Sequence, residues 1–229
     1  MCNHRGQRTA IDRRGLLRAG TALGLGAAAA AAATGASGAR AASLPTRFDA
    51  ADVADIVKDW PDASKAAAED ITRKYGPPQE ATATMLVWRE NGPWVRTIVH
   101  KQGVEHDFPA PHQDVLEQVV AYKVPLNFFN ALATFDGSVI ADRTRGELTA
   151  HCDREATNML TLNLAHDIVR GYKTAEQARD VAADAMRQIQ AGTTPDYAQK
   201  LLLGAPQGDL SDPDTAAVMP AASGSSSSR

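Results

Sequence analysis

The chain has 229 residues, of which 44% are apolar, 22% are charged and 5% are aromatic, and its formal net charge is −3. These values suit a single globular domain, alone or with tails. They exclude a collagen-like chain, a coiled coil, a disulfide-stapled protein and a wholly disordered chain. The near-neutral balance of charges also argues against a nucleic-acid-binding protein.

The first 41 residues differ in composition from the rest of the chain. They contain six arginines, one acidic residue and an Ala/Gly/Leu run over residues 19–33. This run is shorter than the roughly 20 residues that cross a bilayer. A basic start, a short apolar run and the small-residue site Ala39-Arg40-Ala41 are together typical of a secretory signal peptide. We expect cleavage after Ala41, with Ala42 as the alternative, which leaves no stable membrane anchor.

Within this leader, the stretch Asp12-Arg13-Arg14-Gly15-Leu16-Leu17-Arg18 resembles the twin-arginine (Tat) export motif, in which two arginines precede a short apolar run. The resemblance implies that the Tat translocase recognises Arg13 and Arg14 and exports the folded protein to the periplasm. Proteins with such signals often receive a cofactor before export. The alternative is a basic tail followed by an Ala-rich helix with no role in targeting.

Removal of residues 1–41 changes the charge of the chain. It leaves 18 basic and 26 acidic residues, so the net charge becomes −8. No cluster of Lys and Arg remains, and we therefore expect neither nucleic acid nor an anionic membrane surface as a partner. Cys152 becomes the only cysteine, which rules out an intramolecular disulfide. Residues 205–229 lack periodicity and end in a serine run, so we expect a disordered tail after one domain over residues 42–204.

Two helical stripes occupy residues 49–75. The apolar positions at helical spacing are Val53, Ile56, Val57 and Trp60, followed by Ala63, Ala67, Ile71 and Tyr75. The first stripe follows a candidate cap at Asp49, and Gly76 ends the second. Pro61 between them suits the first turn of a helix. The pattern predicts two helices, or one helix kinked at Pro61.

Two β-hairpins are predicted farther along the chain. In the first, residues 82–89 and 94–101 alternate on either side of the turn Glu90-Asn91-Gly92-Pro93. In the second, residues 138–143 and 147–152 flank a short turn at Gly146. Between the hairpins, the apolar spacing predicts short helices over residues 114–122 and 126–134.

The C-terminal half of the domain is predicted to be helical. Asp153 can cap a helix that runs to about Arg170, and Thr174 with Gln177 forms a capping box for a second helix that ends at Gly192. Hairpins make antiparallel pairs and no βαβ rhythm is present, so the fold class is α+β. We expect the two hairpins to join in one antiparallel sheet with helices packed on it.

Motifs of several common protein classes are absent from the sequence. The chain has no G-x-G-x-x-G, P-loop, G-x-S-x-G, H-E-x-x-H or C-x-x-C pattern. Dinucleotide, nucleoside-triphosphate, α/β-hydrolase, zincin, thioredoxin-type and c-type haem functions therefore lack support. The residues do not decide whether the protein is an enzyme.

A polar stretch that follows His100 carries the first candidate site. It contains His106, Asp107, His112 and Asp114. Three histidines at six-residue intervals, with carboxylates among them, are a candidate ligand set for a divalent metal ion, because neutral imidazoles and carboxylates suit Zn, Cu or Fe. The spacing matches no known metal signature. The alternative is a solvated loop between a hairpin and a helix.

Cys152 is the second candidate, at a predicted junction between a strand and a helix. Backbone donors and the helix dipole at such a junction can lower the pKa of a thiol, so Cys152 is a candidate nucleophile or metal ligand. Alternation along the strand places His151 on the opposite side, and a partner would have to be His166 or a loop histidine. The alternative is a small buried cysteine with Asp153 as a helix cap.

Beyond the leader, residues 50–204 resemble a group of uncharacterised exported bacterial proteins. The resemblance rests on Lys74-Tyr75-Gly76-Pro77-Pro78, Asn91-Gly92-Pro93-Trp94, Asp114-Val115-Leu116-Glu117-Gln118 and Asp136-Gly137-Ser138-Val139. It brings no activity with it. We expect a soluble periplasmic protein that acts as a binding or accessory factor for an unknown ligand or partner. The alternative is a metal-binding or redox protein that uses His100, His106 and His112, with or without Cys152.

Overall fold

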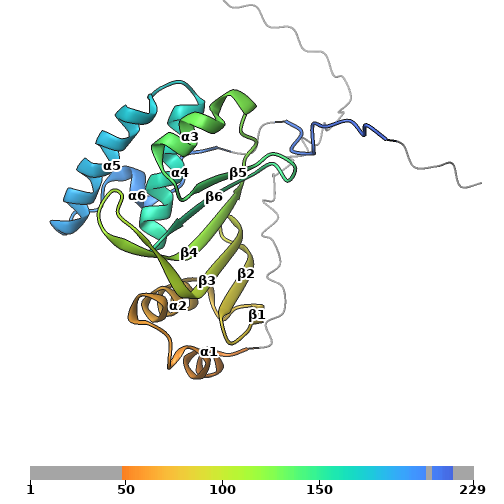
Figure 1. Cartoon of the computed structure of the whole chain (residues 1–229). Helices are drawn as coiled ribbons and strands as arrows, with labels where there is room; N and C mark the ends of the chain where they lie inside the picture. The colour runs from red at the N-terminus through yellow and green to blue at the C-terminus, as the bar shows by residue number, and fades with distance from the viewer. Residues whose placement is uncertain (1–47, 205–207, 219–229) are drawn as a thin grey trace, which may run out of the picture. The chain divides into compact units, whose positions relative to one another are not determined.

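The computed structural model describes residues 48–204 and 208–218. These residues form a six-stranded antiparallel sheet with helices packed on it (Figure 1). This arrangement confirms the predicted α+β class and the single sheet. The predicted signal peptide, with Arg13 and Arg14, lies outside the described residues.

The elements follow the predicted order, with one change of type and two additional short elements. In chain order they are α1 (Ala50–Val57), α2 (Asp62–Tyr75), β1 (Glu80–Ala81), β2 (Met85–Asn91), β3 (Trp94–His106), β4 (His112–Ala121), the 3₁₀ turn η1 (Leu126–Phe128), α3 (Phe129–Phe135), β5 (Val139–Asp142), β6 (Glu147–Cys152), α4 (Glu155–Val169), α5 (Ala175–Gln190) and α6 (Asp196–Gln199). The helix predicted over residues 126–134 is confirmed as η1 and α3. The change of type is at β4, which is a strand where a helix is predicted.

Both predicted hairpins are present, and β4 joins them. The sheet order is β1-β2-β3-β4-β6-β5, so the pairs β2–β3 and β5–β6 flank β4. The β2–β3 turn is tight because Asn91 pairs with Trp94. At that turn Gly92 has φ +69, and a Cβ there would lie 2.8 Å from a ring carbon of Tyr75. A larger residue would therefore strain both the backbone and this contact.

The helix predicted over residues 114–122 is wrong, because this segment is the central strand β4. It pairs with β3 on one side and with β6 on the other. Its apolar side chains are buried on both faces, with Val115, Leu116, Val119 and Val120 each at most 3% exposed. A central strand buried on both faces lacks the alternation of apolar and polar residues that identifies a strand in a sequence.

The helices cover one face of the sheet and form two adjoining parts of the core. One part lies under α3, α4 and α5 and includes Trp94, Leu148 and Leu160. The other lies under α1 and α2 and includes Ile71 and Trp88. Full burial stabilises each of these apolar side chains by about 1.5–3 kcal/mol. Because both parts pack on the same sheet, they hold its helix-facing side chains in fixed positions.

The predicted helix starts are confirmed at two positions and wrong at a third. Asp49 accepts hydrogen bonds from the first turn of α1, and Thr174 forms the expected capping box with Gln177. Before α4, however, the N-cap position is Arg154 and not Asp153. Asp153 instead accepts a hydrogen bond from the Thr157 hydroxyl at 3.1 Å. The carboxylate therefore holds the first turn of α4 through a side chain.

Residues 208–218, within the segment where we expect a tail, contain no helix or strand and contact the β5–β6 end of the sheet. Lys123 Nζ donates to the carbonyl oxygens of Asp209 and Ser211 at 3.0 and 2.9 Å, and Arg143 pairs with Asp214.

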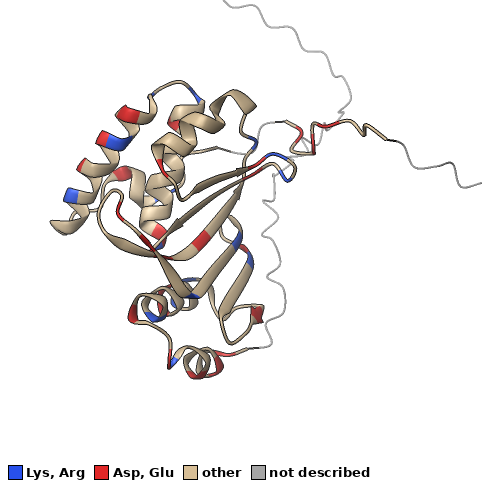
Figure 2. Ribbon diagram, viewed as in Figure 1, with Lys and Arg blue, Asp and Glu red and all other residues tan. Residues whose placement is uncertain are grey.

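Among the described residues, no helix is both long enough and apolar enough to cross a membrane. Helix α5 carries both acidic and basic residues along its length (Figure 2).

Candidate functional site

The end of the β3–β4 hairpin brings two of the predicted histidines together. His106 is the last residue of β3 and His112 the first of β4, and they are direct partners in the antiparallel register. Directly opposite residues have Cβ atoms about 4.5–5.5 Å apart. The imidazole ring centroids are 5.0 Å apart. The five-residue connection over residues 107–111 therefore brings His106 and His112, six residues apart in the sequence, into contact.

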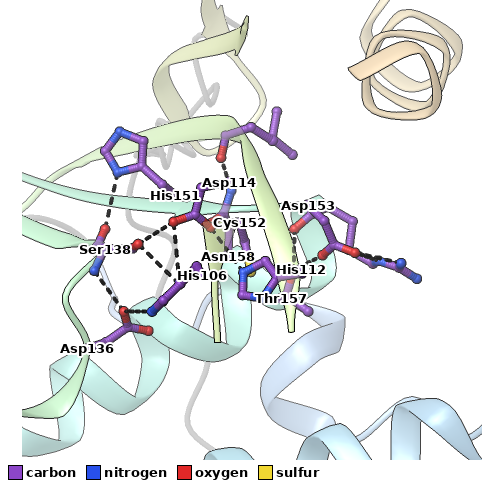
Figure 3. Close-up of polar contacts among 12 residues, drawn as sticks. His106, His112, Asp114, Asp136, Ser138, His151, Cys152, Asp153, Thr157 and Asn158 are labelled. Atoms are coloured by element: carbon purple, nitrogen blue, oxygen red, sulfur yellow. Dashed lines mark hydrogen bonds and ion pairs between the residues drawn. The ribbon is translucent and has the colours of Figure 1, made fainter. Parts of the chain in front are cut away.

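Asp114 lies on the same face of β4 as His112, because strand side chains alternate. Its carboxylate sits between the two histidines (Figure 3), with Oδ1 3.0 Å from His112 Nε2 and Oδ2 3.4 Å from His106 Nδ1. The Ser138 hydroxyl donates to Oδ2. The three residues offer ligand atoms that all lie within 4.8 Å of one another. We call His106, His112 and Asp114 the β3–β4 cluster.

Two further groups fix the orientation of the histidines. His112 Nδ1 lies 2.8 Å from the carbonyl oxygen of Ala110 and must donate to it. His106 Nε2 lies 3.6 Å from Oδ1 of Asp136, which also accepts the backbone N–H of Ser138. Burial raises the pKa of Asp136, although the Ser138 N–H and His106 oppose the rise. His112 therefore has one nitrogen hydrogen-bonded to a group outside the cluster, and His106 has one nitrogen near Asp136. The other nitrogen of each ring faces Asp114.

In the absence of an ion, a proton must hold the β3–β4 cluster together. With Nδ1 committed to Ala110, a neutral His112 would place the lone pair of Nε2 against the carboxylate of Asp114. Burial lowers the pKa of His112, but the hydrogen bonds to Asp114 and Cys152 outweigh it and raise the pKa to about 11. Burial opposes ionisation of Asp114, yet the bonds from His112 and Ser138 lower its pKa overall. The resting site is thus an imidazolium–carboxylate pair.

Cys152 contacts the cluster through His112. It is the last residue of β6 and pairs with Leu116, so its side chain shares the helix-covered face of the sheet with Asp114. Its Sγ lies 3.2 Å from His112 Nε2, and the residue is only 4% exposed. His151, as predicted from the alternation, faces the other side. The loop histidine that pairs with the thiol is therefore His112.

His100 and Asp107 do not join the cluster. His100 lies on the opposite face of the sheet, where its Nε2 is 3.3 Å from Oε2 of Glu117. The convergence of three histidines therefore does not occur. Asp107 is exposed in the turn after β3. In place of these two residues, the structure puts Asp114, Asp136 and Ser138 around the histidines.

Asp114 belongs to the candidate polar stretch, but the predicted helix over residues 114–122 obscured how it reaches the histidines. Read as a strand, residues 112–121 put His112 and Asp114 two positions apart and hence on one face. No comparable signal exists for Asp136 and Ser138, which reach the cluster from the turn before β5. Their positions depend on the sheet order, which places β6 beside β4 and β5 at the edge beyond β6.

A second polar network occupies the opposite face of the sheet. Glu117 lies between His100 and His151, whose Nε2 atoms are 3.3 and 3.5 Å from its Oε2. Arg96 binds Glu147 through both guanidinium nitrogens, at 3.3 and 2.9 Å. The hydrogen bonds with His100 and His151 outweigh the cost of burial and lower the pKa of Glu117 to about 2.

The lowered pKa of Glu117 predicts an acid-sensitive contribution to stability. A depressed carboxylate pKa stabilises the fold above the unfolded value of about 4.5, and the contribution is lost as the pH falls towards 2. Glu117→Gln should remove about 2–3 kcal/mol at pH 6 and flatten the decline of the free energy of unfolding between pH 4.5 and 2. Urea denaturation across this range measures both effects. Glu105→Gln, an exposed position on β3, is the matched control, and equal pH profiles for the two variants would contradict the assignment.

The chain matches no protein-family model, no curated protein and no solved structure. The geometry of the β3–β4 cluster and the chemistry of its side chains are therefore what indicate a function.

Proposed function

We propose that the protein binds one divalent transition-metal ion through His106, His112 and Asp114. The observation that carries the proposal is the approach of three ligand atoms to within 4.8 Å, together with the state of Asp114 Oδ1. This oxygen is buried and accepts no well-oriented hydrogen bond. The charge of His112, 3.0 Å away, compensates this oxygen without a well-aligned hydrogen bond, and a bound cation would supply the direct partner that the oxygen lacks.

The surroundings of the histidines support ligation. Metal-bound histidines usually donate their second ring N–H to a carbonyl or a carboxylate, which fixes the tautomer and the ring. Here the Ala110 carbonyl binds Nδ1 of His112, and Asp136 faces Nε2 of His106. These contacts leave His112 Nε2 and His106 Nδ1 to face Asp114. An ion bound there takes the place of the proton between His112 and Asp114.

The ligand types select a class of ion. Two imidazoles and one carboxylate suit Zn²⁺, Fe²⁺, Co²⁺ or Cu²⁺, whereas Mg²⁺ and Ca²⁺ require sets of oxygen ligands. The β3–β4 cluster offers nitrogen from His106 and His112 and oxygen from Asp114. We therefore expect transition-metal binding that millimolar Mg²⁺ or Ca²⁺ does not displace.

Metal stoichiometry of the purified full chain tests the proposal. After treatment with a chelator, the protein is dialysed against Zn²⁺ or Co²⁺ and analysed for protein and metal. We expect one ion per chain and, at a free ion concentration 100-fold above Kd, about 2.7 kcal/mol of added stability. His106→Ala should abolish binding and His100→Ala should not, because His100 faces Glu117 on the other side of the sheet. Substoichiometric binding, or equal binding by both variants, would overturn the proposal.

We further propose that the protein performs this role in the periplasm after export by the Tat translocase. The support is the motif at Arg13 and Arg14 and the leader that surrounds it. A double Arg13→Lys and Arg14→Lys variant should remain in the cytoplasm as the longer precursor. The matched control is Arg5→Lys with Arg8→Lys, which changes the same residue type outside the motif. Cell fractionation with immunoblotting measures both, and normal export of the first variant would refute Tat recognition.

A further inference from the structure

The surroundings of the Cys152 thiol are polar, although the residue is buried. A cysteine that only fills space packs among apolar groups. Cys152 instead places Sγ 3.2 Å from Nε2 of His112, the same nitrogen that lies 3.0 Å from Oδ1 of Asp114. A thiol sulfur and a buried carboxylate oxygen that accepts no well-oriented hydrogen bond thus face one imidazole nitrogen. All three atoms are metal ligands when deprotonated.

Two of the separations between these atoms are slightly shorter than the edges of a tetrahedral site. With bonds of about 2.05 Å to nitrogen or oxygen and 2.3 Å to sulfur, tetrahedral angles give N···O and N···S edges of about 3.4 and 3.6 Å. The corresponding distances from His112 Nε2 are 3.0 Å to Asp114 and 3.2 Å to Cys152. The group within 4.8 Å comprises the β3–β4 cluster without Cys152. Ligation by the thiol therefore requires Sγ to move towards the ion and His112 to move slightly away from both Asp114 and Cys152.

The site is also largely closed to solvent. The side chain of His106 is 18% exposed, that of His112 9% and that of Asp114 7%, and Cys152 is 4% exposed. A catalytic zinc site keeps one position open for water, whereas a structural site fills all four positions with protein ligands. The low exposure of all four side chains favours the second type.

We propose that Cys152 supplies a fourth ligand beside the β3–β4 cluster. The four residues then form a closed site for a thiophilic divalent ion, with Zn²⁺ as the preferred ion. This inference rests on the proposed metal-binding function. On binding, the Cys152 thiol and the His112 imidazolium each release one proton to solvent, and the ion takes their place. The bound ion then ties together the β3–β4 hairpin and the end of β6, which leads directly into α4.

A competing occupant of the fourth position is a small exogenous ligand. A pocket of about 210 Å³ borders His112 and is lined also by Pro111, Arg154, Thr157 and Met186. Water or a small anion that entered there would make the site open and Cys152 a bystander. The two arrangements differ in the ligand bound to the metal, so spectroscopy separates them.

Cobalt substitution in the full chain distinguishes a closed site from an open one. For this experiment Cys2 is replaced by alanine (Cys2→Ala), so that Cys152 is the only thiol in the chain. We expect stoichiometric Co²⁺, the intense visible bands of a tetrahedral site, and a thiolate-to-cobalt charge-transfer band in the near ultraviolet. Added azide should leave the spectrum unchanged. Cys152→Ser should abolish the charge-transfer band and lower the affinity for Zn²⁺ at least about 100-fold.

The outcomes separate this inference from the proposed function. Stoichiometric Co²⁺ without the charge-transfer band, or with a spectrum that azide changes, overturns the role of Cys152 and leaves metal binding by the β3–β4 cluster intact. Absence of bound Co²⁺ overturns both. Should the Cys152→Ser variant fail to fold, the band in the Cys2→Ala chain still decides, because no other thiol is present.

Discussion

Replacing His112 by alanine should abolish metal binding and also destabilise the metal-free protein. His112 contributes the Nε2 atom that lies between Asp114 Oδ1 and Cys152 Sγ, at 3.0 and 3.2 Å. Its loss removes a ligand, so the affinity for Zn²⁺ should fall at least about 100-fold. In the metal-free state it leaves the buried carboxylate of Asp114 without its closest cation. We expect a loss of about 2–3 kcal/mol in the free energy of unfolding, because Ser138 and His106 still contact the carboxylate.

A double variant separates the two consequences of this substitution. In His112→Ala with Asp114→Asn, the negative charge of Asp114 is also removed, so part of the lost stability should return while metal binding stays absent. Isothermal titration with Zn²⁺ and urea denaturation without metal measure the two effects. His100→Ala is the matched control for a histidine on the other face of the same sheet. Zn²⁺ binding by His112→Ala with wild-type affinity would exclude the site.

The contact between His106 and His112 is predictable from local rules, and that with Asp114 requires the correct element type. Two strands joined by a five-residue turn place His106 opposite His112, and alternation then adds Asp114. The predicted helix over residues 114–122 does not place Asp114 on the same strand face as His112. Val115 and Val119 are four residues apart, as in a helix, and burial of both faces of the strand removes the alternation that would have identified it.

Long-range packing determines the rest of the site. Cys152 reaches His112 across 40 positions in the sequence. Ser138 and Asp136 come close only because β5 returns to the edge of the sheet beyond β6. Neither contact follows from spacing or propensity, since both depend on the strand order. His100 is kept out of the site by the same kind of effect. A β-bulge between Val99 and Val104 shifts the register of β3, so His100 and His106 lie on opposite faces of the sheet.

The hairpins were predictable because their turns carry strong local signals. Asn91-Gly92 combines a residue that tolerates turns with one that adopts φ +69, and Gly146 has φ +63 in the β5–β6 turn. The capping box at Thr174 is equally local. Asp153 shows the limit of such rules, since a side chain of the right type before a helix bonds to Thr157 and leaves the cap position to Arg154.

The largest loss of stability from a single polar substitution outside the cluster is expected for Glu155→Ala. Glu155 is the first residue of α4, and its side chain is 12% exposed. Its Oε1 accepts from the Tyr75 hydroxyl at 2.5 Å and from Trp94 Nε1 at 2.6 Å, and Lys74 donates to Oε2. The carboxylate thus ties α2, β3 and α4 together at the boundary between the two parts of the core. Burial and the bond to Glu155 also raise the pKa of Tyr75, so the phenol stays a donor.

Alanine at position 155 leaves the buried Trp94 N–H and the Tyr75 hydroxyl without an acceptor, and we expect a loss of about 3–5 kcal/mol in the free energy of unfolding. Glu155→Gln keeps an acceptor oxygen and should lose about half as much. Glu176→Ala is the matched control, because Glu176 occupies the first turn of α5 but is exposed. Its loss should stay below about 1 kcal/mol, the scale of an acid at a helix N-terminus. Urea denaturation of the three variants ranks them, and equal losses at positions 155 and 176 would show that the contribution of Glu155 comes from the helix dipole alone.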